Sequence, residues 1–343
     1  MLPATLKEIF ADLWANKARS ILVALSIAVG VFAVGIILTS MLVVKHDMLA
    51  DYNTINPHTA RLYTQEFDDS LLDELRRLPE VETVDASYNI WVKIAANDGR
   101  QHQINLNSII SLETIEVDKL VLEAGSSVLA DGEIYLERQG ASGMGWEVGD
   151  AVTVTIADGT TRTLIVAGTV HDVLANPYKF SGSTSGFVTP ATMADLGGSA
   201  RNNFVNLVTS GSHIDAEHVR QMADQVAEVV NANGITVLNV NVNRPGQPPA
   251  QATLDTVMAL MGVLSVLVLF LSTFLVTNTV SALMGQQVRQ VGVLKALGAT
   301  LLQVIGIYLG LVLAFGLLAL TIAIPIGALA SYVMTRWLIG MLN

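Results

Sequence analysis

The chain has 343 residues, of which 51% are hydrophobic and only 14% are charged, and its formal net charge is −11. This composition is too apolar for an ordinary soluble protein, and the absence of a basic surface argues against nucleic acid as a partner. The absence of cysteine excludes disulfides, thiolate catalysis and cysteine–zinc sites.

The charges are unevenly distributed along the chain. Residues 45–255 contain 13 basic and 28 acidic residues, whereas the rest of the chain contains six basic and two acidic residues. Short loops that carry lysine and arginine stay on the cytoplasmic side of a membrane. The sequence therefore predicts an acidic extracytoplasmic middle between membrane segments whose basic ends face the cytoplasm.

Residues 1–19 are predicted to form a cytoplasmic amphipathic elbow helix that lies along the inner membrane surface, with a soluble packing helix as the alternative. One apolar face is indicated by residues at helical spacing, namely Leu6, Ile9, Phe10, Leu13 and Trp14. Residues 20–45 follow as the first transmembrane span, since Ser20 to Val44 contains no charge. A cleaved signal peptide is the rival interpretation, but its apolar core would be only about 7–15 residues long.

Residues 46–250 are predicted to form an extracytoplasmic α+β domain, long enough to bury its own core. Two β-hairpins are indicated by alternating residues around Asn97-Asp98-Gly99 and around Asp158-Gly159. Helices are predicted at 70–78 and at 216–230, the second with Asp215 as its N-cap, and each has predicted strands beside it. The domain is therefore expected to consist of two β-α-β pieces that enclose a β-rich insertion at about 100–200.

The C-terminal part reads as two further spans joined by a short cationic loop. The second span is predicted at 251–285 and the third at 299–335, because both regions contain long runs without charge. Residues 286–298 between them are predicted to form a short cytoplasmic helix, with Gly298 as its stop and Thr300 as the cap of the next helix. A hairpin loop without a partner is the alternative.

The cationic loop also carries a family resemblance. The run R-Q-V-G-V-L-K-A-L-G-A-T, residues 289–300, resembles the segment between the second and third spans of FtsX-like/MacB-type ABC transporter permeases. In that family the segment is a coupling helix that docks on a cytoplasmic ATPase. The resemblance implies that the contact residues are Gln286, Gln287, Arg289, Gln290, Val293, Leu294 and Lys295.

The resemblance also implies a fourth span, which this chain lacks. Residues 336–343 are thus expected to be an extracytoplasmic end or a truncation point, and the chain a portion of a longer or split permease. Its expected partners are a cytoplasmic ABC ATPase, a second permease copy or half, and the lipid bilayer of a bacterial-type plasma (inner) membrane. ATP and Mg would bind in the partner, because the chain contains no G-x-x-x-x-G-K-[ST] motif.

The predicted fold class is an α-helical transmembrane bundle with a large α+β extracytoplasmic domain inserted between spans 1 and 2. The predicted function is that of a permease subunit, not an enzyme, that couples ATP hydrolysis by a separate ATPase to movements of the outer domain, for export or extraction of a substrate. No catalytic residues, cofactor site or metal site are predicted in the chain. The alternatives are a regulator of an extracytoplasmic cell-wall enzyme and a ligand sensor that uses no ATPase.

Overall fold

The structure is a computed structural model that describes two compact units, formed by residues 1–45 with 253–338 and by residues 46–252 with 339–343. The described residues are 17–97, 99–156, 158–212, 215–243, 247–248, 251–286, 292–293, 296, 298 and 300–342. The elbow helix predicted within 1–19 falls almost entirely outside this description.

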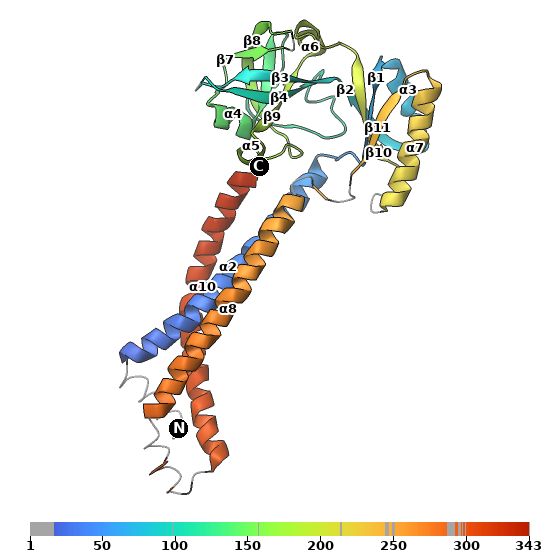
Figure 1. Ribbon diagram of the computed structural model, residues 1–343. Coiled ribbons are helices and arrows are strands. Elements are labelled where there is room, and N and C mark those ends of the chain that lie inside the picture. The colour runs from blue at the N-terminus through green and yellow to red at the C-terminus, as the bar shows by residue number, and fades with distance from the viewer. Residues whose placement is uncertain are drawn as a thin grey trace. The chain divides into compact units, whose positions relative to one another are not determined.

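The first unit is built from three long helices, α2 (Lys17–Thr54), α8 (Gln251–Gln286) and α10 (Leu301–Leu342) (Figure 1). Each contains a segment that is long and apolar enough to cross a membrane: Ala24–Thr54, Asp255–Asn278 and Val312–Trp337. Large apolar side chains such as Leu264, Phe270 and Leu317 are exposed on these helices. A hydrocarbon environment would cover such surfaces at no cost in free energy.

Small residues form the contacts between these helices. Ala28 of α2 is buried against Ala319 and Ala323 of α10. A side chain at Gly30 would come within 2.6 Å of Oγ of Ser272 on α8, so only glycine allows that approach. Helices in lipid associate through close backbone packing of this kind, because lipid provides no hydrophobic force between them.

The second unit contains a four-stranded antiparallel sheet in the order β11-β1-β10-β2. Its strands are β1 (Ala60–Phe67), β2 (Val81–Ser87), β10 (Asn202–Thr209) and β11 (Val237–Val242). The helices α3 (Ser70–Leu75) and α7 (Ala216–Ala232) bury their apolar residues against it. The two β-α-β pieces predicted from the two ends of the domain therefore combine in one sheet, with their strands alternating.

The second sheet has seven strands in the order β5-β8-β6-β9-β4-β3-β7, and an additional pairing of β8 with β7 closes six of them into a ring. The strands are β3 (Asn89–Ala95), β4 (Gln101–Ser108), β5 (Val121–Gly125), β6 (Glu133–Glu137), β7 (Ala151–Thr155), β8 (Thr161–His171) and β9 (Ser183–Val188). The short helices α4 (Arg138–Met144) and α5 (Tyr178–Ser181) lie between strands of this sheet, and α6 (Pro190–Asp195) follows its last strand and leads to β10. Closure removes the exposed edges along which sheets aggregate.

Several local predictions are confirmed. The pairs β3–β4 and β7–β8 are antiparallel hairpins at the predicted turns, with Ile94 opposite His102 and Val152 opposite Leu164. Asp215 caps α7, because its carboxylate accepts the backbone N–H groups of Glu217 and His218. In the first unit, Thr300 and Gln303 cap the start of α10 reciprocally, each side chain accepting the backbone N–H of the other.

Leu136→Ala tests the core of the second sheet. Leu136 lies on β6 and is 0% exposed, so its truncation should leave a cavity and lower the free energy of unfolding by about 2–5 kcal/mol. The matched control is Leu238→Ala on β11, where the side chain is 66% exposed and its loss should cost little. Guanidinium unfolding of the full chain in detergent, followed by the circular dichroism of the strands, measures both. Equal midpoints for the two variants would contradict this assignment of the core.

Candidate functional site

The predicted coupling segment is described only in part. Gln286 is the last residue of α8, and Val293 is helical with an exposed fraction of 54%. Gln287, Arg289, Gln290, Leu294 and Lys295 lie outside the described residues. Gly298 has a φ of 93°, in the left-handed region that ends helices, as its predicted role as a stop requires. The ATPase contact therefore stays a prediction.

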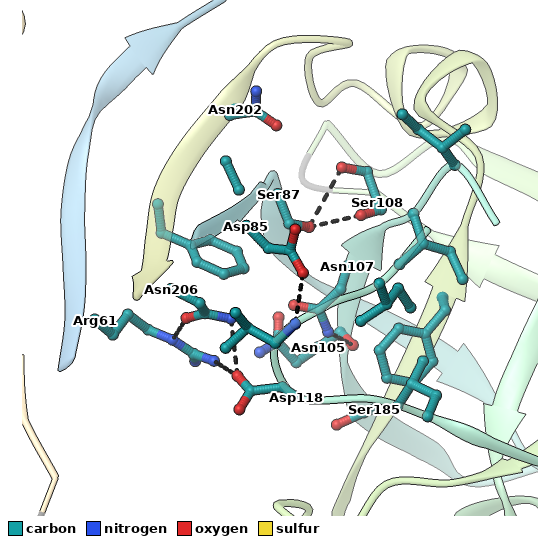
Figure 2. Close-up of a pocket in the computed structure, with 18 of the residues that line it drawn as sticks. Arg61, Asp85, Ser87, Asn105, Asn107, Ser108, Asp118, Ser185, Asn202 and Asn206 are labelled. Carbon is teal, nitrogen blue, oxygen red and sulfur yellow. Dashed lines mark hydrogen bonds and ion pairs between the residues drawn. The ribbon is translucent and has the colours of Figure 1, made fainter. Parts of the chain in front are cut away.

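A second candidate site is a pocket of about 650 Å³ within the α+β unit. Its lining comes from both sheets and from the connecting segment 109–120, the stretch between the end of β4 and the start of β5. Figure 2 shows Asp85, Asn105, Asn107 and Asp118 among the polar side chains gathered there. A volume of this size is typical of small-molecule sites, which occupy about 300–1,000 Å³.

Asp118 is the most highly connected carboxylate of the pocket. Its Oδ2 accepts hydrogen bonds from the side chain of Asn206 at 2.9 Å and from Arg61 at 3.4 Å, and it lies 2.7 Å from Nδ1 of His58. The backbone N–H of His58 donates to Oδ1 at 2.9 Å. Burial raises the pKa of Asp118, but the interactions with His58 and Arg61 lower it by more than burial raises it. The pKa therefore lies below its ordinary value, and the group is ionised at neutral pH.

His58 connects this network to Asn243, near the end of the α+β unit in sequence. Its side chain is nearly buried, and the side-chain amide of Asn243 lies 2.9 Å from its Nε2 and donates to its backbone oxygen at 3.1 Å. In sequence, His58 follows α2 and Asn243 precedes α8. One polar network therefore joins the segment that enters the α+β unit, the segment that leaves it, and the wall of the pocket.

The connecting segment is also fixed by Asp85 of β2. One oxygen of its carboxylate accepts the backbone N–H groups of Glu116 and Val117, both at 2.7 Å. Asn56 adds a side-chain hydrogen bond to the backbone oxygen of Glu116 at 2.9 Å. Since 109–120 leaves the seven-stranded sheet, these bonds attach it to the four-stranded sheet and close one side of the pocket.

Asp172 is the carboxylate whose proton affinity is most perturbed. Burial and the neighbouring charges of Asp118 and Glu137 raise its pKa to about 6, although the backbone N–H of Leu174 and the hydroxyl of Ser185 donate hydrogen bonds to it. A carboxylate held in this way takes up a proton readily and is stabilised by any positive charge that approaches it.

The lining of the pocket is chemically mixed. Among the described residues, no group of three or more histidine, aspartate or glutamate side chains is placed to hold a metal ion. The sequence likewise offers no nucleophile with an adjacent base. The pocket instead combines carboxylates, amides and hydroxyls with the aromatic side chains of Trp91, Phe187 and Phe204.

Sequence reasoning did not find this pocket. Its acidic residues Asp85, Asp118 and Asp172 are separated by tens of residues and belong to no motif. One signal was present in the structure alone: Asp118 and Asn56 are the two non-glycine residues with positive φ among the described residues, at 59° and 52°. Aspartate and asparagine tolerate this region, and such conformations persist where the surrounding contacts enforce them.

Asp172→Asn should change how stability depends on pH. A carboxyl group whose pKa is raised on folding stabilises the fold below its unfolded pKa, near 4, and this contribution is lost as the pH rises through about 6. Asparagine keeps the acceptor oxygen and removes the charge, so the variant should gain on the order of 2 kcal/mol over the wild type between pH 4 and pH 8. Unfolding midpoints measured across that range provide the test.

The control for this prediction is Glu228→Gln on α7, which removes one negative charge from an exposed position. The unfolding midpoint of this variant should depend on pH in the same way as that of the wild type. If Asp172→Asn also ran parallel to the wild type, Asp172 would not be the group that titrates near pH 6.

The C-terminal part of the chain, residues 262–343, matches the family described as FtsX-like permease C-terminal. No curated protein sequence matches the chain. Among solved structures, the extracellular domain of the noncanonic ABC-type transporter YknZ from Gram-positive bacteria aligns with a TM-score of 0.37 and 16% identity over 53% of this chain and 99% of that one. The periplasmic region of MacB from Actinobacillus actinomycetemcomitans aligns with a TM-score of 0.38 and 13% identity over 57% and 94% of the two chains. A domain of a permease protein from Porphyromonas gingivalis gives 0.35 and 14%, over 57% and 96%.

The family match covers the end of α8, the predicted coupling segment and the whole of α10. It therefore confirms the resemblance that was predicted from residues 289–300. The likeness is to the C-terminal domain of FtsX-like permeases, and residues 262–343 carry it.

Proposed function

We propose that the chain is the membrane subunit of an ABC-type system that couples ATP hydrolysis by a separate ATPase to movements of its own α+β unit, for export or extraction of a substrate. The observation that carries this proposal is the FtsX-like permease domain at 262–343, in which a short segment separates two long apolar helices. In the family that the chain resembles, this segment is where the ATPase docks.

The docking surface is the segment Gln286–Leu297. Leu294 is the apolar anchor that enters a groove of the ATPase. The charges of Arg289 and Lys295 speed the encounter with the ATPase and fix the orientation in which the two proteins bind. The remaining contacts are Gln286, Gln287, Gln290 and Val293, of which Val293 is exposed on a helical turn. ATP and Mg bind in the partner subunit, since the chain has no phosphate-binding loop.

The long helices transmit the movement. Both α2 and α8 continue in sequence into the α+β unit, at His58 and Asn243, and these two residues are hydrogen-bonded to each other. A displacement of either helix therefore reaches the same polar network. A second permease copy or half completes the bundle in this proposal.

The proposed location is a bacterial-type plasma membrane, crossed several times, with the acidic unit 46–252 outside the cell. The support is the charge asymmetry between the acidic middle and the basic remainder of the chain.

A ligand sensor is the second candidate function, and the pocket of about 650 Å³ in the outer unit favours it. A sensor would need no ATPase. Co-purification with an ATP-binding subunit separates the two functions. Regulation of a cell-wall enzyme differs from transport in its readout, which is activation of a wall hydrolase instead of release of a substrate.

Leu294→Asp tests the docking surface. The substitution would bury an unpaired charge in the proposed groove, which costs several kcal/mol and should weaken ATPase capture about a hundredfold. Pull-down of the ATPase from detergent measures the effect. Arg289→Ala should act more weakly, because a charge at the rim of an interface mainly changes the association rate and its salt dependence.

The control for docking is Leu238→Asp on β11, which introduces the same charge at an exposed position of the α+β unit. It should leave ATPase capture at the wild-type level. Equal capture by Leu294→Asp and the wild type would mean that the segment is only a hairpin loop, and the sensor function would then be favoured.

Cysteine labelling tests the topology, and the chain has no native cysteine to interfere. Asp158→Cys, at an exposed position beside a hairpin turn, should react with a membrane-impermeant maleimide added to intact cells. Lys295→Cys should react only after the cells are permeabilised. The reverse pattern would overturn the orientation and the docking argument with it.

A further inference from the structure

The pocket of the α+β unit carries an excess of negative charge. Five aspartates line it, but only two arginines and no lysine. Arg61 pairs with Asp118 at 3.4 Å, and Arg76 pairs with Asp73 at 3.3 Å. Aspartates therefore outnumber arginines in the lining by three. The aspartates outside these two ion pairs are Asp69, Asp85 and Asp172.

Two of these carboxylates are held by hydrogen-bond donors that carry no charge. Asp85 accepts two backbone N–H groups, from Glu116 and Val117, and burial raises its pKa. Asp172 accepts the backbone N–H of Leu174, and burial and two neighbouring carboxylates raise its pKa as well. Both groups would therefore be stabilised by a positive charge inside the pocket.

Asn105 has an unsatisfied polar group beside the pocket. It lies on β4 in the pocket wall, and its side-chain oxygen is buried with no hydrogen-bond donor. A buried acceptor without a donor costs about 1–3 kcal/mol, so native structures satisfy nearly all of them. Because this oxygen is closed to solvent, a donor in the pocket would reach it only after the surrounding side chains shift.

Aromatic side chains provide the apolar part of the site. Trp91 lines the pocket with 58% of its surface exposed, and Phe187 and Phe204 line it as well. The faces of aromatic rings attract ammonium groups and also pack against methylene groups. Arg61 already lies over the ring of Phe204, with its guanidinium carbon 4.9 Å from the ring centre.

The carboxylates are spread around the pocket and not gathered at one point. Among the described residues, none forms a group of three that could hold a metal ion. A single divalent cation would need such a group, because it requires several oxygen ligands at once. A ligand with several separated positive charges can instead pair with each carboxylate where it lies.

We propose that this pocket binds an organic polycation, an amine with two or more ammonium groups separated by short apolar spacers. Its ammonium groups lie at Asp85 and Asp172, and its methylene groups lie against Trp91. The site is independent of the ATPase contact, so it stands whether or not the docking segment is correct.

Spermine is the probe for this site, and tetraethylene glycol is a neutral control of similar length. Titration calorimetry uses the full chain in nanodiscs of zwitterionic lipid at physiological ionic strength. Spermine should bind with a stoichiometry of one, and tetraethylene glycol should not bind. The double variant Asp85→Asn/Asp172→Asn should weaken spermine binding at least about tenfold, because it removes two charges and keeps the acceptor oxygens.

Two matched variants complete the test. Asp158→Asn/Asp195→Asn removes the same charge from exposed positions and should leave the affinity unchanged. Trp91→Ala should weaken binding about two- to fivefold, because the methylene groups lose their packing against the ring. Circular dichroism of each variant checks that the unit is folded.

The proposal is overturned if spermine does not bind to the folded wild type, or if tetraethylene glycol binds equally well. It is also overturned if the exposed double variant weakens binding as much as the pocket variant, since spermine would then be responding only to the overall negative charge.

Discussion

The buried carboxylate of Asp118 is the interaction on which the α+β unit depends. An ionised carboxylate away from water must be compensated, because its unpaired burial costs several kcal/mol. Here the compensation comes from His58 just before β1, from Arg61 on β1 and from Asn206 on β10. The charge therefore favours the arrangement that brings these chain segments together.

The pocket is a consequence of this arrangement. Segment 109–120 leaves the seven-stranded sheet after β4, and the bonds from Asp85 and Asp118 hold it against the four-stranded sheet. The polar contacts between this segment and the sheet form one wall of the pocket, and carboxylates line that wall because they make the contacts.

Local chemistry made much of the fold predictable. The hairpins β3–β4 and β7–β8, the cap at Asp215 and the cap at Thr300 each depend on residues close in sequence, so alternation and turn or cap residues identified them. The three apolar helices were predictable from the absence of charge alone. The family match at 262–343 confirmed what the short run at 289–300 suggested.

Long-range pairings were not predictable in this way. The parallel pairs β4–β9 and β6–β8 join strands that no turn connects, and their alternation is compatible with several partners. The pocket depends on the same kind of contact, since Asp118 reaches His58 across 60 residues and Asn206 across 88. A single sequence contains no pattern that predicts which distant side-chain amide donates a hydrogen bond to which carboxylate.

The bond between His58 and Asn243 has a mechanical consequence. The unit is entered at the start of β1 and left at the end of β11, and these two ends are paired, with Ala60 opposite Val242. Pulling the ends apart would open this ladder one hydrogen bond at a time, and the contacts of Asn243 with His58 would be the first to bear the force. When both ends are pulled in the same direction, the ladder carries no load and the sheet moves as a rigid body. The α+β unit would therefore stay intact when both ends are pulled together and would open when they are pulled apart.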